Sequence, residues 1–158
     1  MFGLFSSAPV SDPVLGELKY AKGRWRGMVQ LAGANIPLAI SGSRKVPDAN
    51  AIEAARKLSS TFAAFRPEIE AALFEHYAPY AEAMASGDLP PSTEGHVEVR
   101  APNDVWPHVV TQFVSIEPMA GPLITELGMV VAWDEEHIVG ARFDDKKFIE
   151  LCGSTIPS

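Results

Sequence analysis

Residues 122–154 contain three strand-like segments separated by two short acidic stretches, and apolar side chains occupy alternate positions along the first segment. Successive side chains of a strand point to opposite faces, so a period of two indicates strands that are buried on one side only. The first of these strands has its apolar positions at Leu123, Leu127, Met129, Val131 and Trp133. Turns are predicted at residues 134–137 and 144–146. The last part of the chain, residues 109–154, is therefore expected to form an antiparallel meander.

The earlier part of the chain contains both strand and helix patterns. Residues 13–42 contain three further strand-like alternations, whereas residues 48–86 place apolar side chains at helical spacing. Pro37 lacks a backbone donor, which suggests that the third strand lies at a sheet edge. Pro67 is well placed to begin a second helix, so residues 48–86 are predicted to form a helical hairpin. Pro79 predicts a kink or break in that second helix.

These elements predict a single α+β domain that spans residues 1–158. Residues 1–12 are expected to form an N-terminal tail, and residues 87–108 a loop that separates the helices from the meander. In the order βββ-αα-ββββ, an antiparallel sheet of six or seven strands carries the inserted helical hairpin packed on one face. A chain of 158 residues, 47% of them hydrophobic, can bury such a core without a disulfide or a metal ion.

The single cysteine and the lack of a long apolar run favour a cytoplasmic protein. Cys152 is the sole cysteine, so no disulfide can form within the chain, which fits a reducing compartment. The N-terminus lacks the basic leader of a signal peptide, and no run of about 18 apolar residues is present. No membrane partner is therefore expected.

The chain is acidic, with 13 basic and 20 acidic side chains and a formal charge of -7. Phosphate backbones attract basic surfaces, so no nucleic-acid partner is expected. An acidic surface suits a basic protein partner, and it also promotes solubility. The basic side chains Lys19, Lys22, Arg24 and Arg26 gather on one predicted hairpin. We interpret them as its solvated outer face, with Glu17 as a pairing partner.

The densest group of chemically active side chains comprises Asp134, Glu135, Glu136 and His137, directly after Trp133. Three interpretations remain open: a solvated hairpin turn, a loop that binds a protein partner, and a metal or acid–base site. Consecutive residues of a short turn point in different directions, so they do not converge on one ion by themselves. Trp133 is interpreted either as a core residue or as an interface anchor.

His76 lies on the apolar stripe of the helical segment, where a histidine is more often a hydrogen-bonded core residue than a ligand. An acid–base or metal site would have to combine it with Glu136 and His137. The chain contains no Gly-x-Ser-x-Gly motif and no Gly-rich phosphate loop. No catalytic residue, metal ligand or cofactor is therefore assigned, and Cys152 is treated as a small apolar residue.

Two short motifs lie near the two ends of the chain. Residues 12–18 read DPVLGEL and are followed by WRG at residues 25–27, and residues 133–143 read WDEEHIVGARF. These motifs resemble the "DxxLGxL…WxG" and "WDEEHxxGxxF" hairpins of an uncharacterised bacterial domain family of unknown function. Some relatives look like immunity proteins, which neutralise toxins in bacterial competition. The resemblance implies a binding function and supplies no catalytic residues.

The leading hypothesis is a non-enzymatic binding domain of immunity or regulatory type. It contacts a protein partner through Trp133 and residues 134–137. The first alternative is a metal-dependent or acid–base hydrolytic enzyme with a site near Glu136, His137 and His76. The second alternative is a structural subunit that forms homodimers through the apolar N-terminus and an exposed strand edge.

Overall fold

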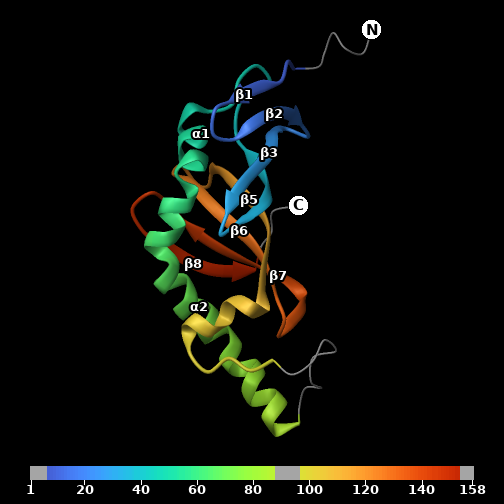
Figure 1. The fold of residues 1–158 in the computed structure, drawn as a ribbon, viewed down its shortest axis with the longest axis vertical. Coiled ribbons are helices and arrows are strands. Elements are labelled where there is room, and N and C mark those ends of the chain that lie inside the picture. Colours follow the sequence, from blue (N-terminus) through green and yellow to red (C-terminus); the bar gives the residue numbers. More distant parts are fainter. Residues whose placement is uncertain (1–6, 88–96, 154–158) are drawn as a thin grey trace.

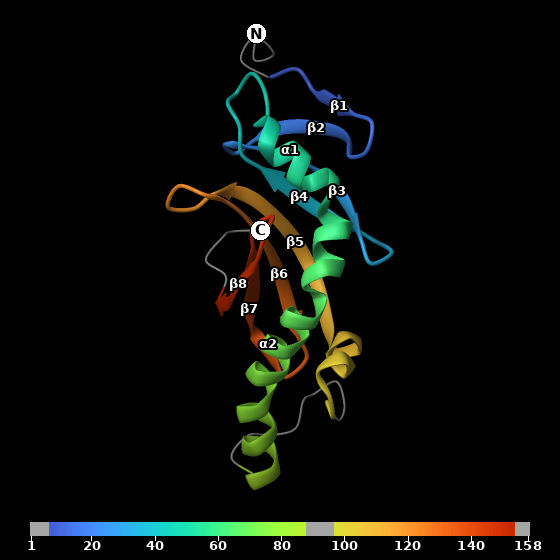
Figure 2. The ribbon, with the colours of Figure 1, turned by 90° about the vertical axis from the view of Figure 1, so that its left-hand side faces the viewer.

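The computed structural model describes residues 7–87 and 97–153, which form an eight-stranded sheet with helices along one face (Figures 1 and 2). The strands, in sheet order and in chain order, are β1 (Val10–Asp12), β2 (Gly16–Ala21), β3 (Arg24–Leu31), β4 (Ala34–Ile40), β5 (Val109–Pro118), β6 (Leu123–Val131), β7 (Asp134–Phe143) and β8 (Phe148–Gly153). The helices are α1 (Ala49–Arg56), α2 (Leu58–Ser86) and the short 3-10 helix η2 (Pro102–His108). The predicted α+β class is confirmed, with the helices inserted between strands. Within the described residues, no helix is both long and apolar enough to cross a membrane.

The sheet is mixed, so the prediction of a purely antiparallel sheet of six or seven strands is wrong in detail. Neighbouring strands are antiparallel except β4 and β5, which run parallel. Parallel neighbours need a long crossover connection, and the helical segment supplies it. The parallel pairing covers only residues 38–40 against residues 114–116. Two antiparallel halves, β1 to β4 and β5 to β8, therefore meet across a narrow contact.

The predicted helical hairpin is wrong, because the chain does not turn back at Pro67. Lys57 alone separates α1 from α2, and α2 runs for 29 residues through Pro67 and Pro79. Both prolines are exposed, so water can solvate the carbonyl groups that lose their helical partners. Gly87, with φ 82°, ends the helix, which agrees with the predicted helical range of residues 48–86. The buried side chains of α2 keep helical spacing on both sides of Pro67, so packing on the sheet stabilises one uninterrupted helix. These side chains are Leu58, Phe62, Ile69, Leu73 and Tyr77.

The predicted N-terminal tail contains strand β1, which pairs with β2. Asp12 is buried at the end of β1, and its Oδ2 accepts hydrogen bonds from the backbone amides of Val14 and Leu15, both at 2.9 Å. Its Oδ1 accepts a hydrogen bond from Nε of Arg56 at 3.0 Å, which ties the β1–β2 hairpin to α1. The alternation did not reveal β1, because the strand has three residues and a carboxylate occupies its buried position.

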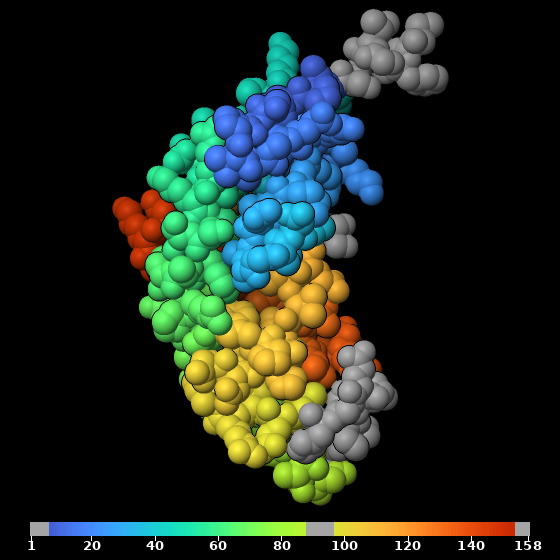
Figure 3. All heavy atoms as spheres, viewed as in Figure 1, coloured from blue at the N-terminus to red at the C-terminus, as the bar shows by residue number. Residues whose placement is uncertain are grey.

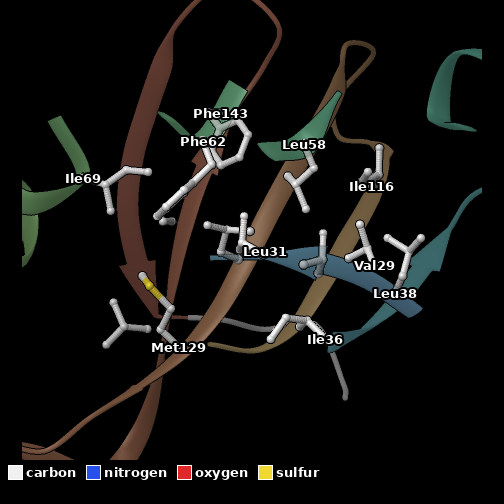
Figure 4. Close-up of a cluster of buried hydrophobic side chains, with 14 of the residues drawn as sticks. Val29, Leu31, Ile36, Leu38, Leu58, Phe62, Ile69, Ile116, Met129 and Phe143 are labelled. Carbon is white, nitrogen blue, oxygen red and sulfur yellow. The ribbon is translucent and has the colours of Figure 1, made fainter. Parts of the chain in front are cut away.

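The C-terminal meander of β6, β7 and β8 forms as predicted. Leu127, Met129 and Val131 of β6 are fully buried in the core. Phe62 and Ile69 of α2 belong to the same cluster of buried side chains, drawn in Figure 4. The other face of β6 is buried as well, which the sequence pattern did not predict. Its buried residues there include Ile124 and Glu126.

The face of the sheet opposite the helices carries ionic contacts between strands, and one of them reaches across β4. Arg142 of β7 donates from Nε to the fully buried Glu126 at 2.7 Å and from Nη1 to Glu150 at 3.2 Å. Arg24 of β3 contacts Glu117 of β5 at 2.9 Å. Its side chain is 21% exposed, so Arg24 is not part of a solvated patch as predicted. These contacts link the strands of both antiparallel halves.

Three smaller expectations have mixed outcomes. The predicted contact between Lys19 and Glu17 is present at 3.3 Å. Pro37 lies in the interior strand β4 and not at a sheet edge as predicted. It precedes residues 38–40, which are the part of β4 that pairs with β5. Its missing N–H therefore breaks no hydrogen bond between β4 and β5. The predicted loop 87–108 contains helix η2. Within the same loop, residues 97–100 form no strand.

Candidate functional site

The predicted site lies where β6 joins β7, but the turn comes two residues earlier than predicted. Ala132 and Trp133 make the turn, and β7 begins at Asp134. Asp134 and Ile138 pair with consecutive residues of β6, so residues 135–137 bulge out of the strand. We refer to Asp134, Glu135, Glu136 and His137 together as the acidic bulge.

Trp133 fixes the turn to helix α2. Its indole Nε1 donates a hydrogen bond to Nδ1 of His76 at 2.9 Å, and its ring packs edge-on against Tyr77 with centroids 5.3 Å apart. Trp133 is only 6% exposed, so it is a core residue and not an exposed interface anchor. The hydrogen bond requires Nδ1 of His76 to be unprotonated, which assigns the proton of the neutral ring to Nε2.

Asp134 makes the second contact between the bulge and α2. The hydroxyl of Tyr80 donates a hydrogen bond to Oδ2 of Asp134 at 2.8 Å. Nδ1 of His137 lies 2.9 Å from Oδ1 of the same carboxylate, which is 9% exposed. The ring of Tyr80 also stacks on His76, with centroids 5.5 Å apart. One carboxylate therefore holds a helix residue and a bulge residue together.

These contacts shift the pKa values of the bulge residues. Burial raises the pKa of Asp134, but the hydrogen bonds from His137 and Tyr80 outweigh burial, and the pKa of the carboxyl lies below its usual value. The hydrogen bond to Asp134 raises the pKa of His137. The same carboxylate raises the pKa of the Tyr80 phenol. Tyr80 therefore stays protonated near neutral pH and acts as a hydrogen-bond donor.

His76 is shifted in the opposite direction from His137. Burial lowers the pKa of the His76 imidazole, the charge of Asp134 partly opposes this effect, and the charge of His137 adds to it. His76 is therefore held in the neutral form that accepts the hydrogen bond from Trp133. The prediction that His76 is a hydrogen-bonded core residue agrees with this geometry.

The remaining side chains of the acidic bulge face solvent. Glu135, Glu136 and His137 are exposed, the side chain of His137 by 70%. The backbone amide of Glu136 donates a hydrogen bond to the Asp134 carboxylate, which fixes the path of the chain within the bulge. The exposed charged side chains therefore lie on a segment that Trp133 and Asp134 attach to helix α2.

The structure brings together most of the residues that the sequence singled out, and adds one. His76 and His137 meet around Asp134, although 61 positions separate them in the chain. Tyr80 was not predicted as a site residue. It lies one helical turn after His76, so its place on the same stripe of α2 was the available signal.

An Asp–His pair can orient an imidazole for proton transfer, as in hydrolytic triads. Here the imidazole of His137 is exposed, and the described cavities of about 430 Å³, 350 Å³ and 620 Å³ are lined by other residues. Among residues 7–87 and 97–153, no group of three or more His, Cys, Asp or Glu side chains is arranged to hold a metal ion.

A family model for a domain of unknown function, DUF6985, matches residues 14–156. The chain belongs to this family. No curated protein and no solved structure matches the chain. The family match agrees with the resemblance to an uncharacterised domain family that the terminal motifs indicate.

In this DUF6985 domain the motif residues have structural roles. Trp25 is fully buried and donates from Nε1 to the carbonyl of Ser43 at 2.8 Å. At Gly27 a Cβ atom would lie 2.6 Å from Cδ2 of Leu18, so no larger residue fits without a shift. At Gly140 a Cβ atom would lie 2.8 Å from Oε1 of Glu126. These glycines allow close packing of neighbouring strands.

Proposed function

We propose that this DUF6985 domain is a non-enzymatic binding module that contacts a protein partner through the acidic bulge. The observation that carries this proposal is the contrast between the two sides of the bulge. Trp133 and Asp134 are hydrogen-bonded to α2, whereas Glu135, Glu136 and His137 are exposed. A surface with this construction is already ordered before its partner arrives.

Order in the free protein matters for affinity, because binding costs free energy when a loop must become fixed. Two hydrogen bonds to α2 and two within the bulge hold the backbone of this segment. The ordering cost is then small when the partner binds. A solvated turn that served only for solubility would not need such contacts.

The charge of the bulge indicates the chemistry of the partner. Glu135 and Glu136 add to a molecule whose formal charge is -7, so a basic protein is attracted both at long range and at contact. A cytoplasmic module of immunity or regulatory type fits this description, since such proteins act by binding. The resemblance of the terminal motifs supports the immunity class.

The test begins with capture of a partner from native cell extract by the tagged domain, followed by titration of the purified partner. The substitution Glu136→Lys leaves the backbone amide that binds Asp134 and reverses one exposed charge. We expect it to weaken the complex about tenfold at low salt, and by a smaller factor at high salt, because exposed charges are screened.

Asp145→Lys is the matched control, because Asp145 is an exposed acidic residue in the turn between β7 and β8. It makes the same change in net charge at a different place. An equal loss of affinity in both variants would show that only net charge matters. Unchanged affinity in the Glu136→Lys variant would show that the acidic bulge is not the contact surface.

A further inference from the structure

A second site lies where strands β4 and β5 diverge. Their pairing is limited to residues 38–40 and 114–116, and the earlier residues of both strands separate to leave a cavity of about 350 Å³. Figure 3 shows the molecular surface hollowed between the turn that joins β3 to β4, in light blue, and the start of β5, in gold. We refer to this cavity as the β4–β5 cleft. Its volume falls in the range of small-molecule sites.

The walls of the β4–β5 cleft are mainly apolar. Leu31 and Ile36 contribute from the β3–β4 hairpin, and Phe62 contributes from α2. Trp106 of η2 packs edge-on against Phe62, with ring centroids 5.5 Å apart. Aromatic and branched side chains in this arrangement suit a compact apolar body.

Arg66 is the one charged side chain among the described residues that line the cleft. Its guanidinium carbon lies 5.1 Å from the centre of the Trp106 ring, and its Nε donates to Glu70 at 3.0 Å. Glu70 also accepts a hydrogen bond from Nε1 of Trp106 at 2.6 Å. Glu70 therefore fixes both the cation and the aromatic ring at the side of the cleft.

The guanidinium of Arg66 keeps donors for a ligand. A guanidinium has five N–H donors in a fixed fork, and this fork matches the two oxygens of a carboxylate. The hydrogen bond to Glu70 uses Nε, while the two Nη atoms make no hydrogen bond within the described part of the chain. Arg66 pairs with Glu70 through Nε, and its Nη donors can bind a carboxylate at the edge of the apolar cavity.

We propose that the β4–β5 cleft binds a monocarboxylate with a compact apolar or aromatic body. The body lies against Phe62, Trp106 and Ile36, and the carboxylate pairs with Arg66. Two sources share this chemistry, a free small acid and the C-terminal residue of a peptide. The cleft is lined by none of the residues of the acidic bulge, so this site does not depend on the function proposed above.

The test is an NMR titration of the full chain with phenylacetate, its neutral isostere phenylacetamide, and hexanoate. A short peptide that ends in phenylalanine, with a free or an amidated C-terminus, separates the two sources. We expect saturable shifts at the amides of Ala34 and Thr111 and at the Trp106 indole. Tighter binding of the free peptide than of phenylacetate would identify a C-terminus, and the reverse would identify a free acid.

Two variants assign the contacts. Arg66→Gln should weaken phenylacetate about tenfold, the effect of losing a charge-assisted hydrogen bond, and leave phenylacetamide unchanged. Ala34→Phe, at an exposed residue that lines the cleft, should fill the cavity and abolish binding of both. Arg100→Gln, at an exposed arginine outside the cleft, is the control.

The proposal would be overturned by two results. One is the absence of saturable shifts at Ala34, Thr111 and Trp106 with phenylacetate, with hexanoate and with the peptide that has a free C-terminus. The other is equal affinity for phenylacetate and phenylacetamide in the unaltered protein, since Arg66 would then make no contribution. A two-dimensional amide spectrum of each variant verifies that it is folded.

Discussion

Two histidines near the same carboxylate respond to pH in opposite ways. The pKa of His137 is raised by its hydrogen bond to Asp134, so its contribution to stability is complete below pH 6.5 and is lost as the pH rises through the raised value. Burial lowers the pKa of His76, so its contribution is present above pH 6.5 and is lost as the pH falls. Protonation of His76 would also remove the acceptor for the Trp133 indole.

The first prediction concerns His137. The substitution Asp134→Asn should lower the pKa of His137 toward 6.5, because it removes the carboxylate that stabilises the charged imidazole. The measurement is the pH dependence of the His137 ring proton shifts by NMR. Glu136→Gln is the control and should give a smaller decrease, since Glu136 contributes less to the shift. An unchanged pKa of His137 in the Asp134→Asn variant would contradict the assigned contact.

The second prediction concerns Asp12, whose pKa is lowered from 3.8 to about 2, chiefly by its hydrogen bond to Arg56. Asp12→Ala should reduce the free energy of unfolding by about 2 kcal/mol at neutral pH, because a buried acceptor of charged and backbone donors is lost. The difference should shrink as the pH falls from about 4 to about 2, where the unaltered carboxyl becomes protonated.

Urea unfolding at several pH values measures this effect. Asp145→Ala, at an exposed residue, serves as the control and should change the free energy of unfolding by less than about 0.5 kcal/mol. A loss in the Asp12→Ala variant that stayed constant down to pH 2 would show that the carboxylate charge is not responsible.

At the scale of elements, helix α2 continues through two prolines because its buried face is packed on both sides of Pro67. Pro67→Ala restores a backbone donor for the carbonyl of Ala63 and removes the ring clash. Removing the proline also gives the unfolded chain more conformational freedom, which opposes this gain. The net effect should be an increase of about 2 kcal/mol in the free energy of unfolding. Thermal and urea unfolding measure the change.

Gly87→Ala is the matched variant at the end of the same helix. Gly87 has φ 82°, which a residue with a Cβ atom adopts with strain, so this variant should lose about 1 kcal/mol. Destabilisation by Pro67→Ala would mean that the proline shape itself is required at this position in α2.

Local sequence patterns predicted the positions of strands and helices, but they did not predict how these elements pair and pack with one another. Leu127, Met129 and Val131 alternate strictly, and the strand they predict is present with those side chains buried. The local sequence around Pro67 is the same whether the helix ends there or continues because its buried face is packed on the sheet. The prediction of a helical hairpin was therefore wrong. The parallel pairing of β4 and β5 depends on the crossover that joins them, and no alternation encodes it.

The acidic bulge was likewise predicted in its position but not in its long-range contacts. The position of the charged group at residues 134–137 is a local feature and was predicted. The hydrogen bonds that hold it are not local, because Trp133 and His76 are 57 positions apart and Asp134 and Tyr80 are 54 positions apart. Sequence placed His76 and Tyr80 on one helix face, but it gave no register between that face and the meander.

At the scale of the whole molecule, the two antiparallel halves of the sheet share a short parallel contact and a common helical cover. Trp25 lies in the first half and Trp133 in the second, and both are buried. We expect both indole NMR signals to disappear at the same urea concentration, because the core formed with α2 joins the halves into one cooperative unit.

Leu58→Ala tests the role of the helix in this cooperativity. Leu58 of α2 is 1% exposed, and its truncation should cost about 2–5 kcal/mol and shift both signals to lower urea by the same amount. Loss of the Trp25 signal at a different urea concentration from the Trp133 signal would show that the halves unfold separately.

The central claim is that α2 holds the acidic bulge in one conformation before any partner binds. The most direct measurement is the amide ¹⁵N relaxation of Glu135, Glu136 and His137 in the free protein. We predict order parameters of about 0.85, as in a rigid backbone, and a decrease in a Tyr80→Phe variant that cannot bind Asp134. Values below about 0.6 in the unaltered protein would contradict the claim.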